Sequence, residues 1–222
     1  MDVSFFLNRR IAFIRQLYVT ASESYIERKR RIEAKVEPFI PPYSEDGEPP
    51  FLEKWLEANE SLQVLGHSCI SMLAATLHLY FKTKERHIGI AVDDSLKPDF
   101  KKGWFNGYKA YFACRVSIRF EDGPVNLAIL EELVLARNRI QHPESITCQS
   151  MHYSDDDLQK LPPHPFFLDE KERALLAEED GQCTWLIPPT INVSSERLFS
   201  ALTEVGRFVE WLEQVEIESH AR

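Results

Sequence analysis

Cysteine and glycine are scarce in this chain of 222 residues, which has four of the former and eight of the latter. The cysteines, Cys69, Cys114, Cys148 and Cys183, are widely separated and form no Cys-x-x-Cys pair, so we expect reduced thiols rather than a disulfide framework. The chain also has no glycine-rich phosphate loop, no nucleophile elbow and no His-Glu-x-x-His pair. The best-known signatures of nucleotide hydrolases, serine hydrolases and zinc proteases are therefore absent.

Long apolar runs and an excess of positive charge are missing as well. No apolar run approaches the roughly 20 residues of a membrane span. The first ten residues do not resemble a signal peptide, because the apolar patch is short and Arg9 and Arg10 follow it. We therefore expect a cytoplasmic protein without a membrane segment. The net charge of −9 argues against general affinity for nucleic acid but leaves room for a small cationic site.

Apolar side chains recur with helical spacing through most of the chain, which predicts a mainly α fold. We expect one domain, residues 1–222, built as a bundle of about five helices. The expected helices are 3–37, 51–86, 99–120, 125–141 and 194–217. Prolines end the first helix, and small residues such as Gly66 and Ala74 should let the second approach its neighbours closely. Residues 143–184 form an irregular insertion, and 184–193 could make a short two-stranded β-ribbon.

Two segments carry charge that allows a second interpretation. The mixed-charge run at 27–35 could touch RNA, although a solvated helix face is the better interpretation. Asp155, Asp156 and Asp157 suggest a metal only weakly and more often form a helix N-terminus before Leu158. The aromatic side chains of 99–120 are expected in the core rather than as a base-stacking platform.

Histidines provide no convincing metal site. His67 and His78 are eleven residues apart, too far to share a metal, and we interpret them as core or surface residues. Cys148 and His152, four apart, could both bind zinc if they lie on a helix, but no second pair is nearby. We therefore expect no metal and no cofactor.

The end of the helix at 125–141 has an unusual composition. Leu127, Leu130 and Val134 form an apolar stripe, and Arg137 continues it, so a guanidinium lies where a core residue is expected. His142 precedes Pro143, which disfavours helical geometry, so the helix should end near Gln141. A surface helix end, whose cations complement the dipole, is the structural alternative.

Arg137, Asn138 and His142 match a family motif: Arg, a polar residue, three variable residues and His, late in a helical bundle. The pattern resembles the HEPN superfamily (higher eukaryotes and prokaryotes nucleotide-binding). The motif covers six residues, and the helical layout extends the likeness loosely over 51–217. The resemblance implies a metal-independent endoribonuclease that acts as a homodimer, with both motifs in a shared cleft.

The resemblance also implies a role for each motif residue. His142 would be the acid and base for attack of the RNA 2′-hydroxyl on the adjacent phosphate. Arg137 would hold the scissile phosphate, and Asn138 would position the site. Many relatives are toxins restrained by an antitoxin protein, so the expected partners are RNA, a second copy and an antitoxin, in a toxin–antitoxin or defence system. The alternative is a non-catalytic, dimeric helical module that recruits a protein partner or a nucleotide.

Overall fold

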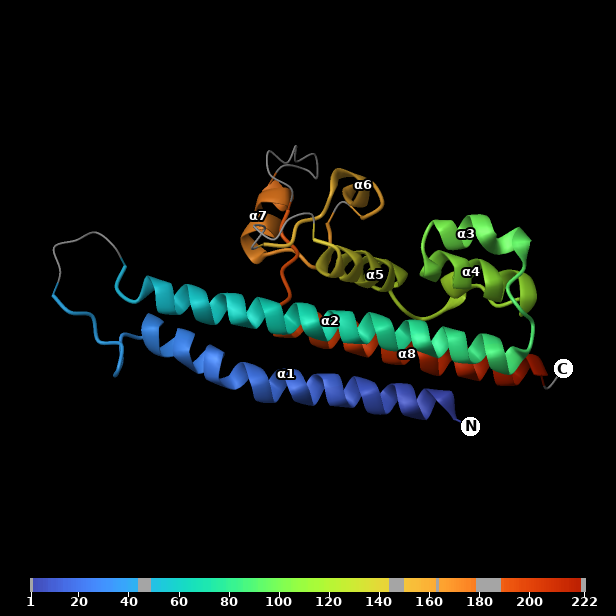
Figure 1. Cartoon of the computed structure of the whole chain (residues 1–222), viewed down its shortest axis with the longest axis horizontal. Coiled ribbons are helices and arrows are strands. Elements are labelled where there is room, and N and C mark those ends of the chain that lie inside the picture. The colour runs from blue at the N-terminus through green and yellow to red at the C-terminus, as the bar shows by residue number, and fades with distance from the viewer. Residues whose placement is uncertain (1, 44–48, 144–149, 163, 179–188, 221–222) are drawn as a thin grey trace.

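Three long helices lie side by side and form the body of the molecule (Figure 1). In this computed structural model, residues 2–43, 49–143, 150–162, 164–178 and 189–220 are described. The long helices are α1 (Val3–Glu33), α2 (Leu52–Ile88) and α8 (Ser195–His220). α2 and α8 run in one direction and α1 runs opposite to them. The mainly α fold is confirmed.

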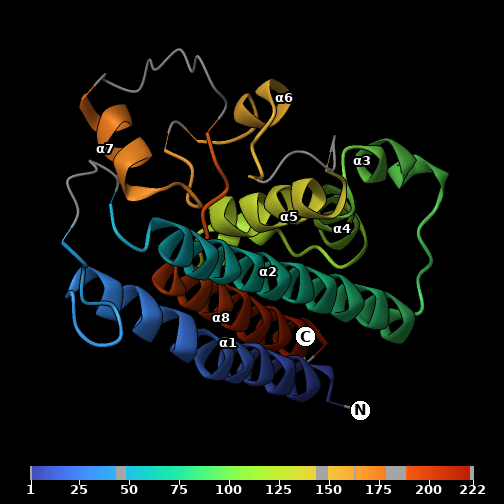
Figure 2. The ribbon, with the colours of Figure 1, turned by 60° about the vertical axis from the view of Figure 1, so that its left-hand side comes forward.

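Shorter helices cover the face of α2 that lies away from α1 (Figure 2). They are α3 (Lys97–Lys101), α4 (Trp104–Arg115), α5 (Leu127–Gln141), α6 (Asp155–Leu158) and α7 (Glu170–Glu178), with 3₁₀ turns at Asp94–Leu96 and Phe120–Asp122. α5 packs against both α2 and α8. Its position on these two long helices places Arg137 of the candidate motif beside α2.

Helix ends differ from the sequence prediction where the backbone takes a left-handed conformation. The first helix ends at Glu33 rather than residue 37, because Lys35 has a φ of 54°. The expected helix 99–120 is two helices, since Gly103, with a φ of 125°, separates α3 from α4. Only a residue without a Cβ adopts that conformation without strain. The second helix extends to Ile88, slightly past the expected end at residue 86.

Only the second half of the expected ribbon at 184–193 lies within the described residues, and there it pairs with another part of the chain. Thr190 forms an antiparallel bridge with His152, and Ile191 N–H donates to the carbonyl of Met151 at 2.7 Å. This pairing partner is the segment after the motif helix. Residues 184–187, the first half of the expected ribbon, lie outside the described residues. This pairing ties the insertion to the chain just before α8, whose first turn is capped by Ser194.

Most aromatic side chains of the expected helix 99–120 lie in the core, as the sequence predicted. Phe105, Tyr108, Tyr111 and Phe112 of α4 are buried, together with Phe120. α2 is the central helix and packs against α1, α5 and α8. Among the described residues it is also the one helix whose length and composition would suffice to cross a membrane, although half of its apolar window is buried in the bundle. The sequence pattern did not predict a segment apolar enough to cross a membrane, and such a composition suits a helix that is surrounded by other helices.

Gly66 allows the close approach expected of the small residues on α2, but the neighbour is not a helix. A Cβ at Gly66 would lie 2.8 Å from the Cβ of Val193. The residue in contact therefore belongs to the extended segment that leads into α8.

Candidate functional site

The motif helix ends where proline is expected to end it. α5 stops at Gln141, and His142 leaves the helix with φ −128° and ψ 63°. The backbone N–H of His142 still donates to the carbonyl of Asn138 at 3.0 Å. The last turn therefore persists, and His142 is exposed at the helix end.

The two arginines of the motif segment have different surroundings. Arg139 pairs with Asp157 and hydrogen-bonds Ser154, so it links α5 to the N-terminus of α6. Burial raises the pKa of Asp157, but hydrogen bonds from Arg139 and Ser154 outweigh it and hold that pKa below its ordinary value. The three aspartates form the first turn of α6, with Ser154 and Asp157 in a capping box, as the cap interpretation predicted. Arg139 is thus part of the framework.

Arg137 has no such partner. Its Nη1 donates to the Oδ1 of Asn138 at 2.9 Å, and among the described residues no carboxylate lies within ion-pair distance of it. The side chain is half-buried. A guanidinium held by a neutral amide keeps its charge and most of its donors for another group.

Arg137 lies in a small pocket between α2, α4 and α5. The pocket has a volume of about 230 Å³, and its polar lining comprises Arg137, His78 and Lys82, with Trp104 beside them. His78 stacks on Trp104, with ring centroids 4.6 Å apart and an interplanar angle of 14°. Two cations, an imidazole and an indole thus surround one hollow.

The surroundings of His78 favour its neutral form. Burial lowers the pKa of His78, and the positive charges of Lys82 and Arg137 lower it further. A neutral imidazole can accept one hydrogen bond and donate another. The pocket therefore presents positive charge from two side chains and a neutral polar ring from a third.

Sequence reasoning set His78 aside as a core or surface residue. It is half-buried, and it shares the pocket with Arg137. A local signal existed, because His78 and Lys82 are four residues apart and share a helix face. Nothing in the sequence placed that face against Arg137. His67, by contrast, is a structural residue, since its ring hydrogen-bonds the carbonyl of Ile191 at 2.9 Å.

His142 does not line the Arg137 pocket. His142 comes five positions after Arg137, which corresponds to about 140° around an ideal helix axis. Within one copy of the chain, His142 therefore lies outside the pocket that holds Arg137. The described structure brings Arg137 to Asn138 and His78, and leaves His142 exposed beside them on the helix end.

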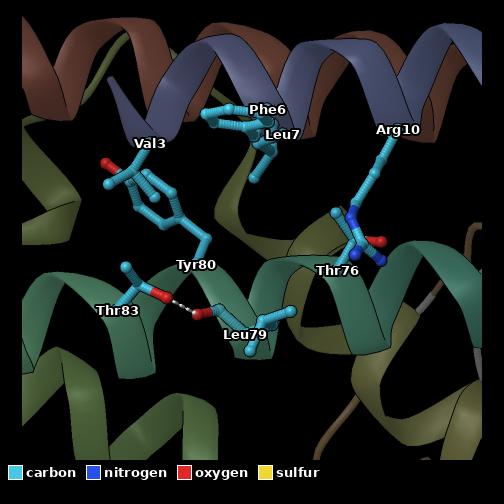
Figure 3. Close-up of a pocket in the computed structure, with 8 residues that line it drawn as sticks. All are labelled: Val3, Phe6, Leu7, Arg10, Thr76, Leu79, Tyr80 and Thr83. Atoms are coloured by element: carbon cyan, nitrogen blue, oxygen red, sulfur yellow. Dashed lines mark hydrogen bonds between the residues drawn. The ribbon is translucent and has the colours of Figure 1, made fainter. Parts of the chain in front are cut away.

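A second pocket, with mainly apolar walls and a volume of about 240 Å³, lies between α1 and α2 (Figure 3). Phe6 from α1 and Leu79 from α2 line it, and Arg10 extends from α1 toward Thr76. Leu79 also lines the Arg137 pocket. Phe6 and Leu79 are both exposed, so apolar surface adjoins the cationic pocket.

A buried carboxylate connects the motif helix to the insertion. Glu132 of α5 is fully buried and accepts hydrogen bonds from the Tyr153 hydroxyl at 2.6 Å and from the N–H groups of Phe166 and Phe167 at 2.6 and 2.7 Å. Burial raises the pKa of Glu132, and these donors oppose that rise. The sequence pattern assigned Glu132 no role.

Metal ligation finds no support in the described residues, where no three His, Cys, Asp or Glu side chains gather as ligands would. Cys148, half of the possible zinc pair, lies outside the described residues. The chain matches no protein-family model, no curated protein and no solved structure. The case for a function therefore rests on the site's own geometry and on the motif.

Proposed function

We propose that the protein is a metal-independent endoribonuclease of the HEPN type, whose site is completed by a second copy of the chain. The observation that carries the proposal is Arg137, a half-buried guanidinium without a carboxylate partner among the described residues. It lies in a pocket with Lys82, near the end of the helix after which His142 is exposed. Two cations in a small pocket suit a phosphodiester.

The reaction follows from the chemistry of these groups. A histidine takes the proton of the RNA 2′-hydroxyl, whose oxygen attacks the adjacent phosphorus. The bond from phosphorus to the 5′-oxygen breaks, and that oxygen receives a proton, which leaves a 2′,3′-cyclic phosphate and a 5′-hydroxyl. Arg137 stabilises the charge that builds on the phosphoryl oxygens, and Asn138 holds Arg137 through its 2.9 Å hydrogen bond.

Arg137 and His142 are separated within one copy, and dimerisation can bring the His142 of one copy to the Arg137 of the other. One imidazole cannot readily serve both as base and as acid on opposite sides of an in-line displacement, whereas two symmetry-related imidazoles can. The exposed Phe6 and Leu79 beside the pocket supply apolar surface that a second copy would cover. The biological setting that we propose is a toxin–antitoxin or defence system, in which an antitoxin protein restrains the activity.

The test is cleavage of end-labelled RNA by purified protein in EDTA. We expect His142→Ala to lose about 100- to 10,000-fold in rate, the usual contribution of a general acid or base, and Arg137→Ala to lose a comparable factor. The matched controls are His87→Ala and Arg86→Ala, an exposed pair at the far end of α2, which should cleave like wild type. Cleavage that survives both motif substitutions, or that EDTA abolishes, would exclude the mechanism.

A mixed dimer tests whether the site is shared. Co-expression of wild-type chains with His142→Ala chains yields heterodimers that hold one intact imidazole. Because the proposed reaction uses one imidazole as base and the other as acid, these heterodimers should cleave RNA much more slowly than the wild-type dimer. Heterodimers that retain about half of the wild-type rate or more would contradict a shared site.

The alternative function, a non-catalytic binding module, is favoured by a different observation. α1 exposes four large apolar side chains, Phe6, Phe13, Val19 and Ile26. Phe6 and Phe13 lie on one side of the helix and Val19 and Ile26 on another, and exposed apolar side chains of this kind can mark a surface for a protein partner. If RNA stays intact while Phe13→Glu changes the mass measured by light scattering, the binding function is the better one.

A further inference from the structure

A second positively charged pocket lies on another face of the motif helix, between α5, α7 and α8. It has a volume of about 560 Å³ and is lined by Glu132, His164, Phe166, Arg173 and Arg197, among others. It shares no lining residue with the Arg137 pocket. Its volume falls in the range of small-molecule sites, roughly 300–1,000 Å³.

Two guanidinium groups converge on a single carbonyl in this pocket. Arg173, from α7, donates through Nη2 to the oxygen of Phe166 at 3.3 Å, and Arg197, from α8, donates through Nη1 to the same oxygen. The guanidinium of Arg197 also lies 4.9 Å from the centre of the Phe166 ring. Like charges held this close repel each other, so a negative counter-charge nearby would stabilise the two guanidinium groups.

The described residues supply that counter-charge without a direct ion pair, through the charges of Glu132, Glu196 and Glu170 near Arg197. Neither arginine has a carboxylate within ion-pair distance among them, and the Nε of Arg173 is buried without a hydrogen-bond partner. Burial lowers the pKa of Arg197, and the charge of Arg173 lowers it further. A buried donor without an acceptor is unfavourable, so the arginine pair is not fully satisfied within the described residues.

Glu132, the acid in this pocket, is already engaged. Its two oxygens accept from Tyr153, Phe166 and Phe167. These bonds fix the Phe166 segment and thereby the carbonyl that both arginines share. Glu132 thus builds the pocket, and among its described lining residues two guanidinium groups face one carboxylate.

We propose that this pocket binds a small organic anion, whose phosphate or carboxylate group is held by Arg173 and Arg197. Guanidinium groups bind both oxyanions through paired N–H donors, and two of them from different helices can bind one group from two sides. The pocket is larger than a bare oxyanion needs, so the ligand carries an organic body that reaches toward the exposed His164. This site is independent of the ribonuclease proposal.

Isothermal titration calorimetry at constant ionic strength tests the proposal. The probes are inorganic phosphate, adenosine monophosphate and citrate, with neutral adenosine as the uncharged control. We expect saturable binding of at least one anion and none of adenosine. Binding of the phosphate compounds identifies a phosphate ligand, and binding of citrate alone identifies a carboxylate; either result supports the site.

Variants locate the binding. Arg173→Gln and Arg197→Gln should each weaken binding at least about tenfold, whereas Arg86→Gln, a surface arginine on α2, should not. Arg197→Lys keeps the charge and should bind better than Arg197→Gln, and circular dichroism melts confirm that each variant is folded. Absence of saturable binding for all three anions, or equal binding in folded Arg173 and Arg197 variants, would overturn the proposal.

Discussion

The hydrogen bond from Tyr153 to Glu132 joins the insertion to the motif helix, and its removal should have a measurable cost. Tyr153 is buried, and its hydroxyl lies 2.6 Å from the Glu132 carboxylate. Tyr153→Phe removes that oxygen and keeps the ring. A hydrogen bond to a charged group contributes about 1.5–3 kcal/mol to the free energy of unfolding.

The expected loss lies in the lower part of that range. Glu132 keeps the N–H donors of Phe166 and Phe167, so its charge is not left without partners. A loss of about 1.5–2 kcal/mol corresponds to a fall in Tm of about 3–8 °C for a protein of this size. Tyr43→Phe is the matched control, because Tyr43 is 93% exposed and should leave Tm unchanged.

The cost should also depend on pH. Burial raises the pKa of Glu132 and the Tyr153 hydroxyl opposes that rise, so the phenylalanine variant raises the folded-state pKa further. A group whose pKa is raised on folding binds its proton more readily in the folded state, so the variant regains stability relative to wild type as the pH falls. Urea unfolding at about pH 7.5 and about pH 5 measures this. An equal or larger cost at the lower pH would refute the role assigned to Glu132.

Two further predictions concern the framework around the motif. Gly66→Ala should lower the free energy of unfolding by about 1–2 kcal/mol, because overpacking against Val193 outweighs the gain in helix propensity of about 1 kcal/mol. Gly206→Ala on α8, whose Cβ would meet nothing closer than 3.8 Å, should instead raise the free energy of unfolding. Denaturant unfolding of the two variants should therefore give changes of opposite sign. Arg139→Gln should lower the free energy of unfolding by about 1–2 kcal/mol near neutral pH. Since the pKa of Asp157 is lowered on folding, the stability it contributes is present above its unfolded pKa and lost as the pH falls through the folded value, so the cost of Arg139→Gln should vanish in acid; a constant cost would rule out the pair.

The existence of the long helices could be predicted from the sequence. Helix hydrogen bonds join residues four apart, so the apolar spacing that predicts a helix is present in any short window. The stripes on α2 and α8 have this property, and both were expected with nearly the observed bounds. The helix ends were less predictable. Lys35 and Gly103 interrupt helices through their backbone conformation, and the residues around them only weakly indicate that conformation.

The candidate site likewise has a part that the sequence predicts and a part that it does not. The sequence alone determined that Arg137, Asn138 and His142 come at a helix end and that Pro143 stops the helix, because these are relations between close neighbours in the chain. Only the tertiary structure decided that His78 and Lys82, more than fifty residues earlier, share a pocket with Arg137, and that Glu132 fixes the insertion through Tyr153. Those contacts join helices whose mutual packing depends on every side chain between them, and no local pattern specifies it.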